Sequence, residues 1–400
     1  MPAPSPLNHR TFPVLSAASA KLLAGAGVAA LFLGAPTARA QDLSADWERV
    51  NGPRVVAYDG VDSPFFTPDG RLHTVQHLGR KQSTIRLNAA STGWETTGSP
   101  DVYVAPPPPR DTERRLTTVG VWRRGQFYIG YSESGMADGV AWRMNVKRQN
   151  TSGTGWEQVA APWTDDFGSV GAWESIGKLS LMVGGPNETL YAVSYGTRSP
   201  RIARLDDANN RWETLTSPGD LDNRDRPVLA LRPSDGKPFF MASSGFVYRR
   251  NDAETGWDNL PSVLPIDPVG SQTWRDRPIA RSLVFDGAGR LYVAYDNYRA
   301  IVGPPQGVIV RRNAADPGWE QVELPTGLAI RDGWNNDFRL ERSPNGTIYA
   351  HNIGQRDVPK TVVRLNAAGT AWEAVGGSVG PTGFNGQLLF RPGDGRPYVV

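Results

Sequence analysis

Tryptophan followed directly by an acidic residue recurs along this 400-residue chain, and it constrains the fold more than any other feature. Seven such pairs lie 45 to 62 residues apart: Trp47-Glu48, Trp94-Glu95, Trp156-Glu157, Trp212-Glu213, Trp257-Asp258, Trp319-Glu320 and Trp372-Glu373. An eighth pair, Trp173-Glu174, falls outside this spacing. Such a spacing predicts one supersecondary unit repeated along the chain, with connecting loops of varying length.

The clearest repeat covers residues 281–324 and contains four short strand patterns, at 282–285, 291–295, 308–312 and 319–324. A turn at 286–289 joins the first two, and its glycines reach positive φ without steric penalty. Four antiparallel strands in each repeat are typical of the blade of a β-propeller. The tryptophans then begin the fourth strand of each blade. We expect their indoles to pack between neighbouring blades and the acids to lie at the surface.

Ring side chains mark the second strand of seven repeats: His73, Tyr128, Tyr191, Phe239, Tyr292, Tyr349 and Tyr398. The sequence therefore predicts an all-β protein, a seven-bladed β-propeller of four-stranded antiparallel blades. The N-terminal fourth strand, residues 47–50, would close the ring together with the C-terminal strands near 388–390 and 397–400. No third strand is visible for this closing blade, so the sequence leaves open whether the blade is incomplete.

The first 40 residues have the pattern of a secretory signal peptide. Basic residues precede an apolar run at 22–35, and Ala38-Arg39-Ala40 supplies small residues at the cleavage position. The apolar run is too short to span a bilayer. We expect a signal peptide at 1–40, a single propeller domain at 41–400, and a secreted or periplasmic monomer without membrane insertion.

Charge and composition narrow the classes of partner. The chain has three more basic than acidic residues, and this excess comes from the three basic residues of the first 40. The rest of the chain has 40 residues of each sign. Such a balance gives no electrostatic argument for nucleic acid as a partner. The chain has no cysteine and only four histidines. We expect no disulfides, no metal site built on histidines and no cofactor, with structural calcium left open.

Four turns between the third and fourth strands, NAASTGWE, NDAETGWD, NAADPGWE and NAAGTAWE, resemble degenerate forms of the Asp-box, or BNR, repeat of sialidase-like propellers. The segment RDRPIARSLVFDGAGRLYVAYDN also resembles blades of BNR-type polysaccharide lyases. Families with these repeats include sialidases, other glycoside hydrolases, polysaccharide lyases and binding propellers. The resemblance therefore implies a carbohydrate partner.

Candidate site residues gather in the loops that open on one face of such a propeller. These loops join each fourth strand to the next blade, and each second strand to the third. Predicted catalytic residues are Asp225, Asp276, Asp337, Tyr295 and His351. Predicted substrate-binding residues are Arg226, Arg277, Arg339, Trp274, Trp334, Asn336, Tyr131 and Asn297.

Arginine binds carboxylates with two parallel hydrogen bonds, and aromatic faces stack on sugar rings, so this mixture suits an acidic saccharide. In our first hypothesis the three arginines hold a sugar carboxylate and one of the three aspartates transfers a proton. In a lyase, Tyr295, Tyr131 or His351 would serve as acid or base. His351 also replaces a residue that is small or apolar in other repeats.

The sequence thus predicts a secreted carbohydrate-active propeller, a glycoside hydrolase or a polysaccharide lyase. The alternative is a non-catalytic propeller of the cell envelope that binds a glycan or a protein. A scaffold without a site is the third interpretation, and in it each Arg-Asp pair is a salt bridge between blades.

Overall fold

The computed structural model describes residues 61–78, 81–90, 93–97, 103–104, 117–133, 143–163, 178–195, 201–218, 228–241, 246–261, 279–297, 306–312, 318–325, 328, 338–352, 360–377 and 387–399. All of them belong to the unit Leu43–Val400. Their regular structure consists of β-strands, as the repeats predicted. Within these ranges no helix has the length and apolar character needed to cross a membrane.

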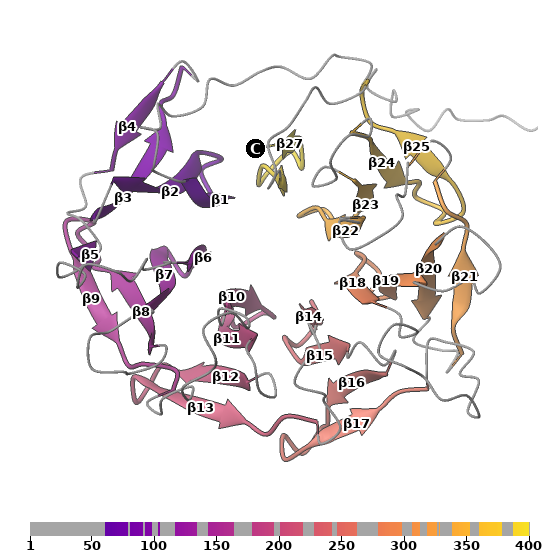
Figure 1. The fold of residues 1–400 in the computed structure, drawn as a ribbon, viewed down its shortest axis with the longest axis horizontal. Coiled ribbons are helices and arrows are strands. Elements are labelled where there is room, and N and C mark those ends of the chain that lie inside the picture. The colour runs from indigo at the N-terminus through magenta and orange to yellow at the C-terminus, as the bar shows by residue number, and fades with distance from the viewer. Residues whose placement is uncertain are drawn as a thin grey trace, which may run out of the picture. The chain divides into compact units, whose positions relative to one another are not determined.

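Six antiparallel sheets have four strands in consecutive order, and each forms one blade (Figure 1). Blade 1 is β1 (Val61–Phe66), β2 (Leu72–Leu78), β3 (Lys81–Leu87) and β4 (Trp94–Thr96), with β5 (Tyr103–Val104) paired to β3. Blade 2 is β6 (Thr117–Arg123), β7 (Gln126–Glu133), β8 (Arg143–Gln149) and β9 (Trp156–Val159). Blade 3 is β10 (Lys178–Gly184), β11 (Thr189–Tyr195), β12 (Arg201–Asp206) and β13 (Arg211–Leu215).

Blade 4 is β14 (Val228–Leu231), β15 (Pro238–Met241), β16 (Val247–Arg250) and β17 (Trp257–Asn259). Blade 5 is β18 (Ile279–Phe285), β19 (Leu291–Asn297), β20 (Gln306–Arg312) and β21 (Glu320–Val322). Blade 6 is β22 (Arg339–Arg342), β23 (Ile348–His351), β24 (Val362–Leu365) and β25 (Trp372–Ala374). The chain then forms a two-stranded sheet, β26 (Leu388–Phe390) with β27 (Pro397–Val399), which we call the C-terminal hairpin.

The predicted count of seven four-stranded blades is therefore wrong, because six are present in the described structure. The seven ring positions do mark seven second strands, the last of them β27, but only β26 accompanies β27 in a sheet. The segment 47–50, predicted to complete that blade, lies outside the described residues.

The first strand of each blade lies towards the centre of the circle of blades (Figure 1). First strands of neighbouring blades contact one another from β1 through β6, β10, β14 and β18 to β22, and β26 contacts β1. Phe390 of the hairpin packs on Tyr349 of blade 6, with ring centroids 4.6 Å apart. On its other side, Tyr398 packs on Phe66 of blade 1. The hairpin thus takes the place of a blade between blades 6 and 1.

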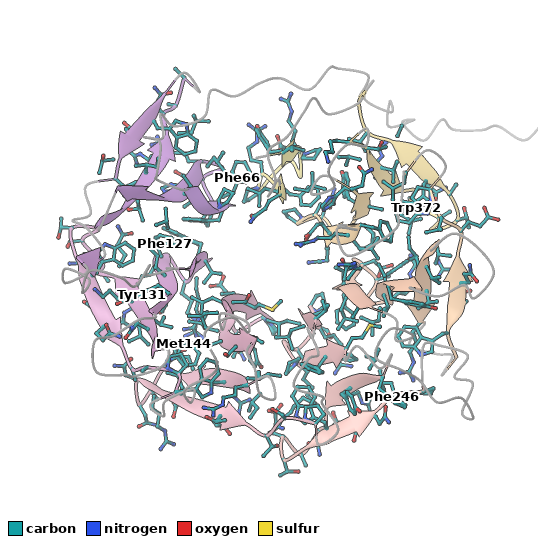
Figure 2. All side chains as sticks on the ribbon, viewed as in Figure 1. Phe66, Phe127, Tyr131, Met144, Phe246 and Trp372 are labelled. Carbon is teal, nitrogen blue, oxygen red and sulfur yellow. The ribbon has the colours of Figure 1, made fainter. Side chains whose placement is uncertain are left out.

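Apolar side chains from facing sheets form the core. Phe127 of blade 2, labelled in Figure 2, is one of these side chains. Its ring lies against that of Phe65 of blade 1, with centroids 4.3 Å apart. Similar clusters join blades 2 to 3, 3 to 4, 4 to 5 and 5 to 6. Each blade buries one face against the next, so stability comes from many similar contacts between neighbours.

A row of three side chains crosses every blade. The ring residue of the second strand lies opposite an arginine of the third, and this arginine lies opposite the acid that follows the repeated tryptophan. All six arginine–acid pairs form ion pairs, at 2.5 to 3.0 Å: Arg86–Glu95, Arg148–Glu157, Arg204–Glu213, Arg249–Asp258, Arg311–Glu320 and Arg364–Glu373. The repeated acid is therefore a partner for the third-strand arginine.

The repeated tryptophans join neighbouring blades, which confirms their predicted packing role. The indole of Trp212 donates a hydrogen bond to the carbonyl oxygen of Ala160 at 2.6 Å, and that of Trp319 donates to Pro261 at 2.8 Å. Trp372 donates to Glu323 at 2.7 Å. In each case the acceptor follows the fourth strand of the preceding blade.

Candidate functional site

Most of the predicted site residues lie outside the described residues. These are Asp225, Asp276, Asp337, Arg226, Arg277, Trp274, Trp334 and Asn336. Their roles stay predictions. Five predicted residues remain, and they come from blades 2, 5 and 6: Tyr131, Tyr295, Asn297, Arg339 and His351.

Tyr131 and Tyr295 lie near the ends of second strands but are buried between blades. Tyr131 is 3% exposed and packs in the cluster between blades 1 and 2, with Lys147 over its ring. Tyr295 is 4% exposed and packs against blade 4, and this burial raises the pKa of its hydroxyl. A tyrosine whose pKa is raised stays protonated at neutral pH, so Tyr295 is poorly suited to act as a base. Asn297 ends β19, opposite Gln306.

Arg339 and His351 form a cross-strand pair at the same end of blade 6. Arg339 begins β22, His351 ends β23, and the two residues lie directly opposite each other. Arg339 is exposed, whereas His351 is only 2% exposed. Burial, and secondarily the charge of Arg339, lower the pKa of His351 to about 3. His351 is therefore neutral at physiological pH.

The corresponding positions in blades 2 to 5 carry no charge. Opposite pairs there are Val119 and Gly130, Ser180 and Val193, Val228 and Met241, and Ser282 and Ala294. The sequence-based observation that His351 replaces a small or apolar residue is thus confirmed by the strand register. Blade 6 is distinguished from blades 2 to 5 by a pair of polar side chains.

Glu341 is a third polar residue of this group, and it was absent from the sequence-based prediction. It lies two residues after Arg339 on β22 and opposite Tyr349 of β23. Alternate residues of a strand share a face, and so do directly opposite residues of an antiparallel pair. Arg339, Glu341, Tyr349 and His351 therefore lie on one face of blade 6.

That face looks towards the C-terminal hairpin. Tyr349 belongs to a cluster with Val362, Val375 and Leu388, and Phe390 and Val399 pack against it. The other face of blade 6 carries Leu340 and Ile348, which belong to the core shared with blade 5. Glu341 thus sits at the junction between blade 6 and the hairpin, which we call the blade 6 junction.

In every other sheet the residue at the position of Glu341 is apolar. The residues opposite the second-strand ring are Phe65, Val121, Met182, Ala230, Val284 and Leu389. Burial raises the pKa of Glu341 to about 7, although the charge of Arg339 acts in the opposite direction. A carboxyl group that titrates near neutral pH beside an exposed arginine is a candidate for proton transfer.

The sequence did contain a signal for Glu341. In each repeat this position comes near the end of the first strand, two or three residues before the turn that joins it to the second. A comparison of the repeats at this position shows an acid in blade 6 and an apolar side chain in every other repeat. Attention to the loops alone could not find it, because Glu341 lies within a strand.

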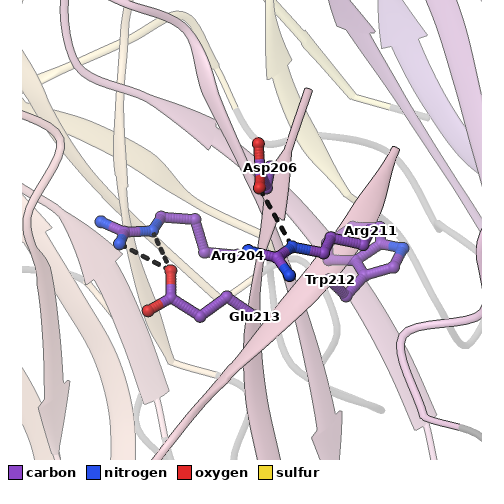
Figure 3. A pocket seen from close by; sticks show the side chains of 5 residues that line it. All are labelled: Arg204, Asp206, Arg211, Trp212 and Glu213. Carbon is purple, nitrogen blue, oxygen red and sulfur yellow. Dashed lines mark hydrogen bonds and ion pairs between the residues drawn. The ribbon is translucent and has the colours of Figure 1, made fainter. Parts of the chain in front are cut away.

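An open hollow of about 610 Å³ lies elsewhere, on the outer strands of blade 3 (Figure 3). Its lining contains Trp212 and two ion pairs, Arg204–Glu213 at 2.7 Å and Arg211–Asp206 at 3.2 Å. These four charged groups satisfy one another, and the first pair belongs to the row that recurs in every blade. The hollow is therefore explained by the blade architecture.

The described part of the chain contains no group of three His, Asp or Glu side chains that could hold a metal ion. Arg339, Glu341 and His351 instead offer one cation, one titratable acid and one neutral imidazole. Such a set can bind an anion and exchange a proton with it.

Comparison with known proteins supports the propeller class. No protein-family model and no curated protein matches the sequence. The chain is similar to an oligogalacturonate lyase in complex with manganese, at 12% identity, covering 85% of this chain and 89% of that chain with a TM-score of 0.50.

Two further solved structures have TM-scores of 0.48. One is oligogalacturonate lyase from Vibrio parahaemolyticus, at 11% identity, with 84% of this chain and 87% of that chain covered. The other is an ulvan lyase bound to a glucuronate–sulfated rhamnose saccharide, at 13% identity, with 80% and 86% covered. At these identities the likeness concerns the fold alone.

Proposed function

We propose that this protein is an exported carbohydrate-active propeller that acts on an acidic glycan at the blade 6 junction. One observation carries the proposal: Arg339, Glu341 and His351 share one face of blade 6, at positions where blades 2 to 5 carry no charge. The fold is one that also carries an oligogalacturonate lyase. The degenerate BNR-like turns and the signal-peptide pattern of residues 1–40 agree with an exported, glycan-directed protein.

The chemistry follows from the three side chains. The exposed guanidinium of Arg339 binds the carboxylate of a uronic acid unit and neutralises its charge. This neutralisation acidifies the neighbouring C–H bond, as elimination by a lyase requires, and the same contact orients the sugar for hydrolysis. Glu341 has a pKa close to the working pH, the condition that favours proton transfer. Asp225, Asp276 and Asp337 remain candidates for a second proton-transferring group.

A panel of uronic acid polysaccharides and sialosides tests the proposal. Reducing ends report hydrolysis, whereas reducing ends together with the ultraviolet absorbance of unsaturated products report elimination. We expect one acidic glycan to be cleaved and Arg339→Ala to lower kcat/KM by about 100-fold or more, because a charge-assisted bidentate contact is lost. Arg211→Ala is the matched control, because Arg211 is an exposed arginine on the outer wall of blade 3.

If the protein binds a glycan but cleaves none, the enzyme hypothesis is wrong and the protein is the non-catalytic binding propeller. Equal loss of activity in Arg339→Ala and Arg211→Ala would remove the site from the blade 6 junction.

A further inference from the structure

Glu341 has surroundings that favour its neutral form. On the hairpin side the junction is apolar, with Leu388, Phe390 and Val399 packed against the cluster of Tyr349. On blade 6 itself, Arg339 is the one described charge that acts on the Glu341 carboxyl. The next charges along the row, Arg364 and Glu373, neutralise each other in an ion pair at 2.9 Å.

Tyr349 and His351, the two neighbouring titratable groups on this face, are uncharged near neutral pH. Burial raises the pKa of Tyr349 and lowers that of His351, so the phenol stays protonated and the imidazole stays neutral. Near neutral pH, Glu341 is therefore the described group of this junction whose charge changes.

An anion that binds Arg339 changes this balance. Residues two apart on a strand lie about 7 Å from each other, so a carboxylate held by Arg339 comes within reach of the Glu341 side chain. The bound anion cancels the positive charge that favours the ionised form of Glu341. It also repels an ionised Glu341, whereas a protonated carboxyl donates a strong hydrogen bond to it.

We propose that the blade 6 junction is a site for a carboxylate-bearing sugar, and that it binds this sugar together with a proton held by Glu341. The inference rests on the proposed function for the class of ligand, and it is independent of whether cleavage follows. The ligand is recognised by charge at Arg339 and by an acid–carboxylate hydrogen bond at Glu341.

Calorimetric titration with a galacturonate oligosaccharide tests this, with its methyl ester as the uncharged comparison. The affinity of the wild type is expected to be constant below about pH 7 and to fall by roughly tenfold for each pH unit above it. Titrations near pH 7 in buffers of different ionisation enthalpy should show uptake of a fraction of a proton, rising towards one at higher pH.

Two variants locate the effect. Glu341→Gln keeps the shape and the hydrogen-bond donor, and its affinity should lose the dependence on pH. Glu213→Gln removes the corresponding exposed acid of blade 3, away from the junction, and its affinity should follow that of the wild type.

The outcomes separate the two proposals. A wild type that binds the galacturonate with the same affinity from about pH 6 to about pH 9 overturns the coupled proton but leaves an acidic glycan as ligand. If binding is coupled to proton uptake but no glycan is cleaved, the proposed enzymatic activity is wrong and the inference of a coupled proton stands. Equal binding of the acid and its ester overturns both the site and its ligand class. Unchanged pH dependence in Glu341→Gln assigns the proton elsewhere and overturns the role of Glu341.

Discussion

Burying the carboxyl of Glu341 makes the stability of the protein depend on pH. Its pKa is about 7 in the folded state, against an ordinary value of 4.5, so the folded protein keeps a proton that the unfolded chain releases first. The contribution of the neutral acid is therefore complete below about pH 4.5 and is lost as pH rises through about 7. A shift of this size corresponds to about 3 kcal/mol at most, since the side chain is partly exposed.

Glu341→Gln should remove this dependence. Relative to the wild type, the free energy of unfolding of the variant should increase by about 1 to 3 kcal/mol between about pH 5 and about pH 8. Urea denaturation at the two pH values measures the difference, and Glu213→Gln, which removes the corresponding exposed acid of blade 3, is the control. A difference between variant and wild type that is the same at both pH values would mean that Glu341 titrates normally.

The effect of His351 on the pH dependence of stability is opposite to that of Glu341. Its pKa is about 3 in the folded state and ordinarily 6.5, so the unfolded chain takes up a proton first as pH falls. Its stabilising contribution is complete above about pH 6.5 and is lost towards about pH 3. We predict that His351→Gln loses less stability than the wild type between about pH 6.5 and about pH 4.5, as measured by urea denaturation. Parallel curves would contradict a neutral, buried imidazole.

At the scale of elements, glycines let the hairpins of neighbouring blades approach closely. Gly346 of blade 6 has a φ of 87°, and a Cβ added there would lie 2.4 Å from the Cα of Gly287 in blade 5. The backbone N–H of Gly287 also donates a hydrogen bond to the carbonyl oxygen of Gly346 at 3.0 Å. The contact is between two backbones, so no side chain can move to relieve a clash.

Gly346→Ala should therefore lower the free energy of unfolding by more than the strain of a positive φ alone would. We expect a loss of about 3 kcal/mol or more in the free energy of unfolding, against about 1 kcal/mol for Gly289→Ala. Gly289 is the matched control, because its φ is 78° and nothing lies within 4 Å of an added Cβ. Equal losses in thermal or urea denaturation would show that the two hairpins do not touch.

Strands and blades could be predicted from the sequence because they repeat. Ring residues, Trp-acid pairs and glycine turns agree from one repeat to the next, and each reflects a local preference or a contact that recurs. The ion-pair partner of each acid was missed because it depends on register: Arg204 and Glu213 are nine residues apart but meet across β12 and β13.

The candidate site was harder to predict because it depends on departures from the repeat. Tyr295 was predicted to be catalytic from its place at a strand end, yet its side chain turns into the core between blades 4 and 5. Glu341 was missed because candidate residues were sought in the loops, whereas Glu341 lies within strand β22. Arg339 and His351 were among the predicted residues because they are polar and lie at strand ends, and their roles stay predictions.

At the scale of the whole propeller, the three polar residues lie where the regular pattern of four-stranded blades stops. Blades 6 and 1 each pack with one face on the two-stranded hairpin, whereas the other junctions join two four-stranded blades. In the described structure, a face with Arg339, Glu341 and His351 is thus paired with the smallest sheet. Among the described residues, this arrangement distinguishes the blade 6 junction from the junctions between four-stranded blades.

A crystal structure of the protein with a bound galacturonate oligosaccharide tests this account most directly. We predict that a sugar carboxylate binds the guanidinium of Arg339 and lies within hydrogen-bond distance of Glu341. Arg339→Ala crystals soaked under the same conditions should show no sugar there. Sugar bound instead at the outer hollow around Trp212, with the blade 6 junction empty in the wild type, would contradict the account.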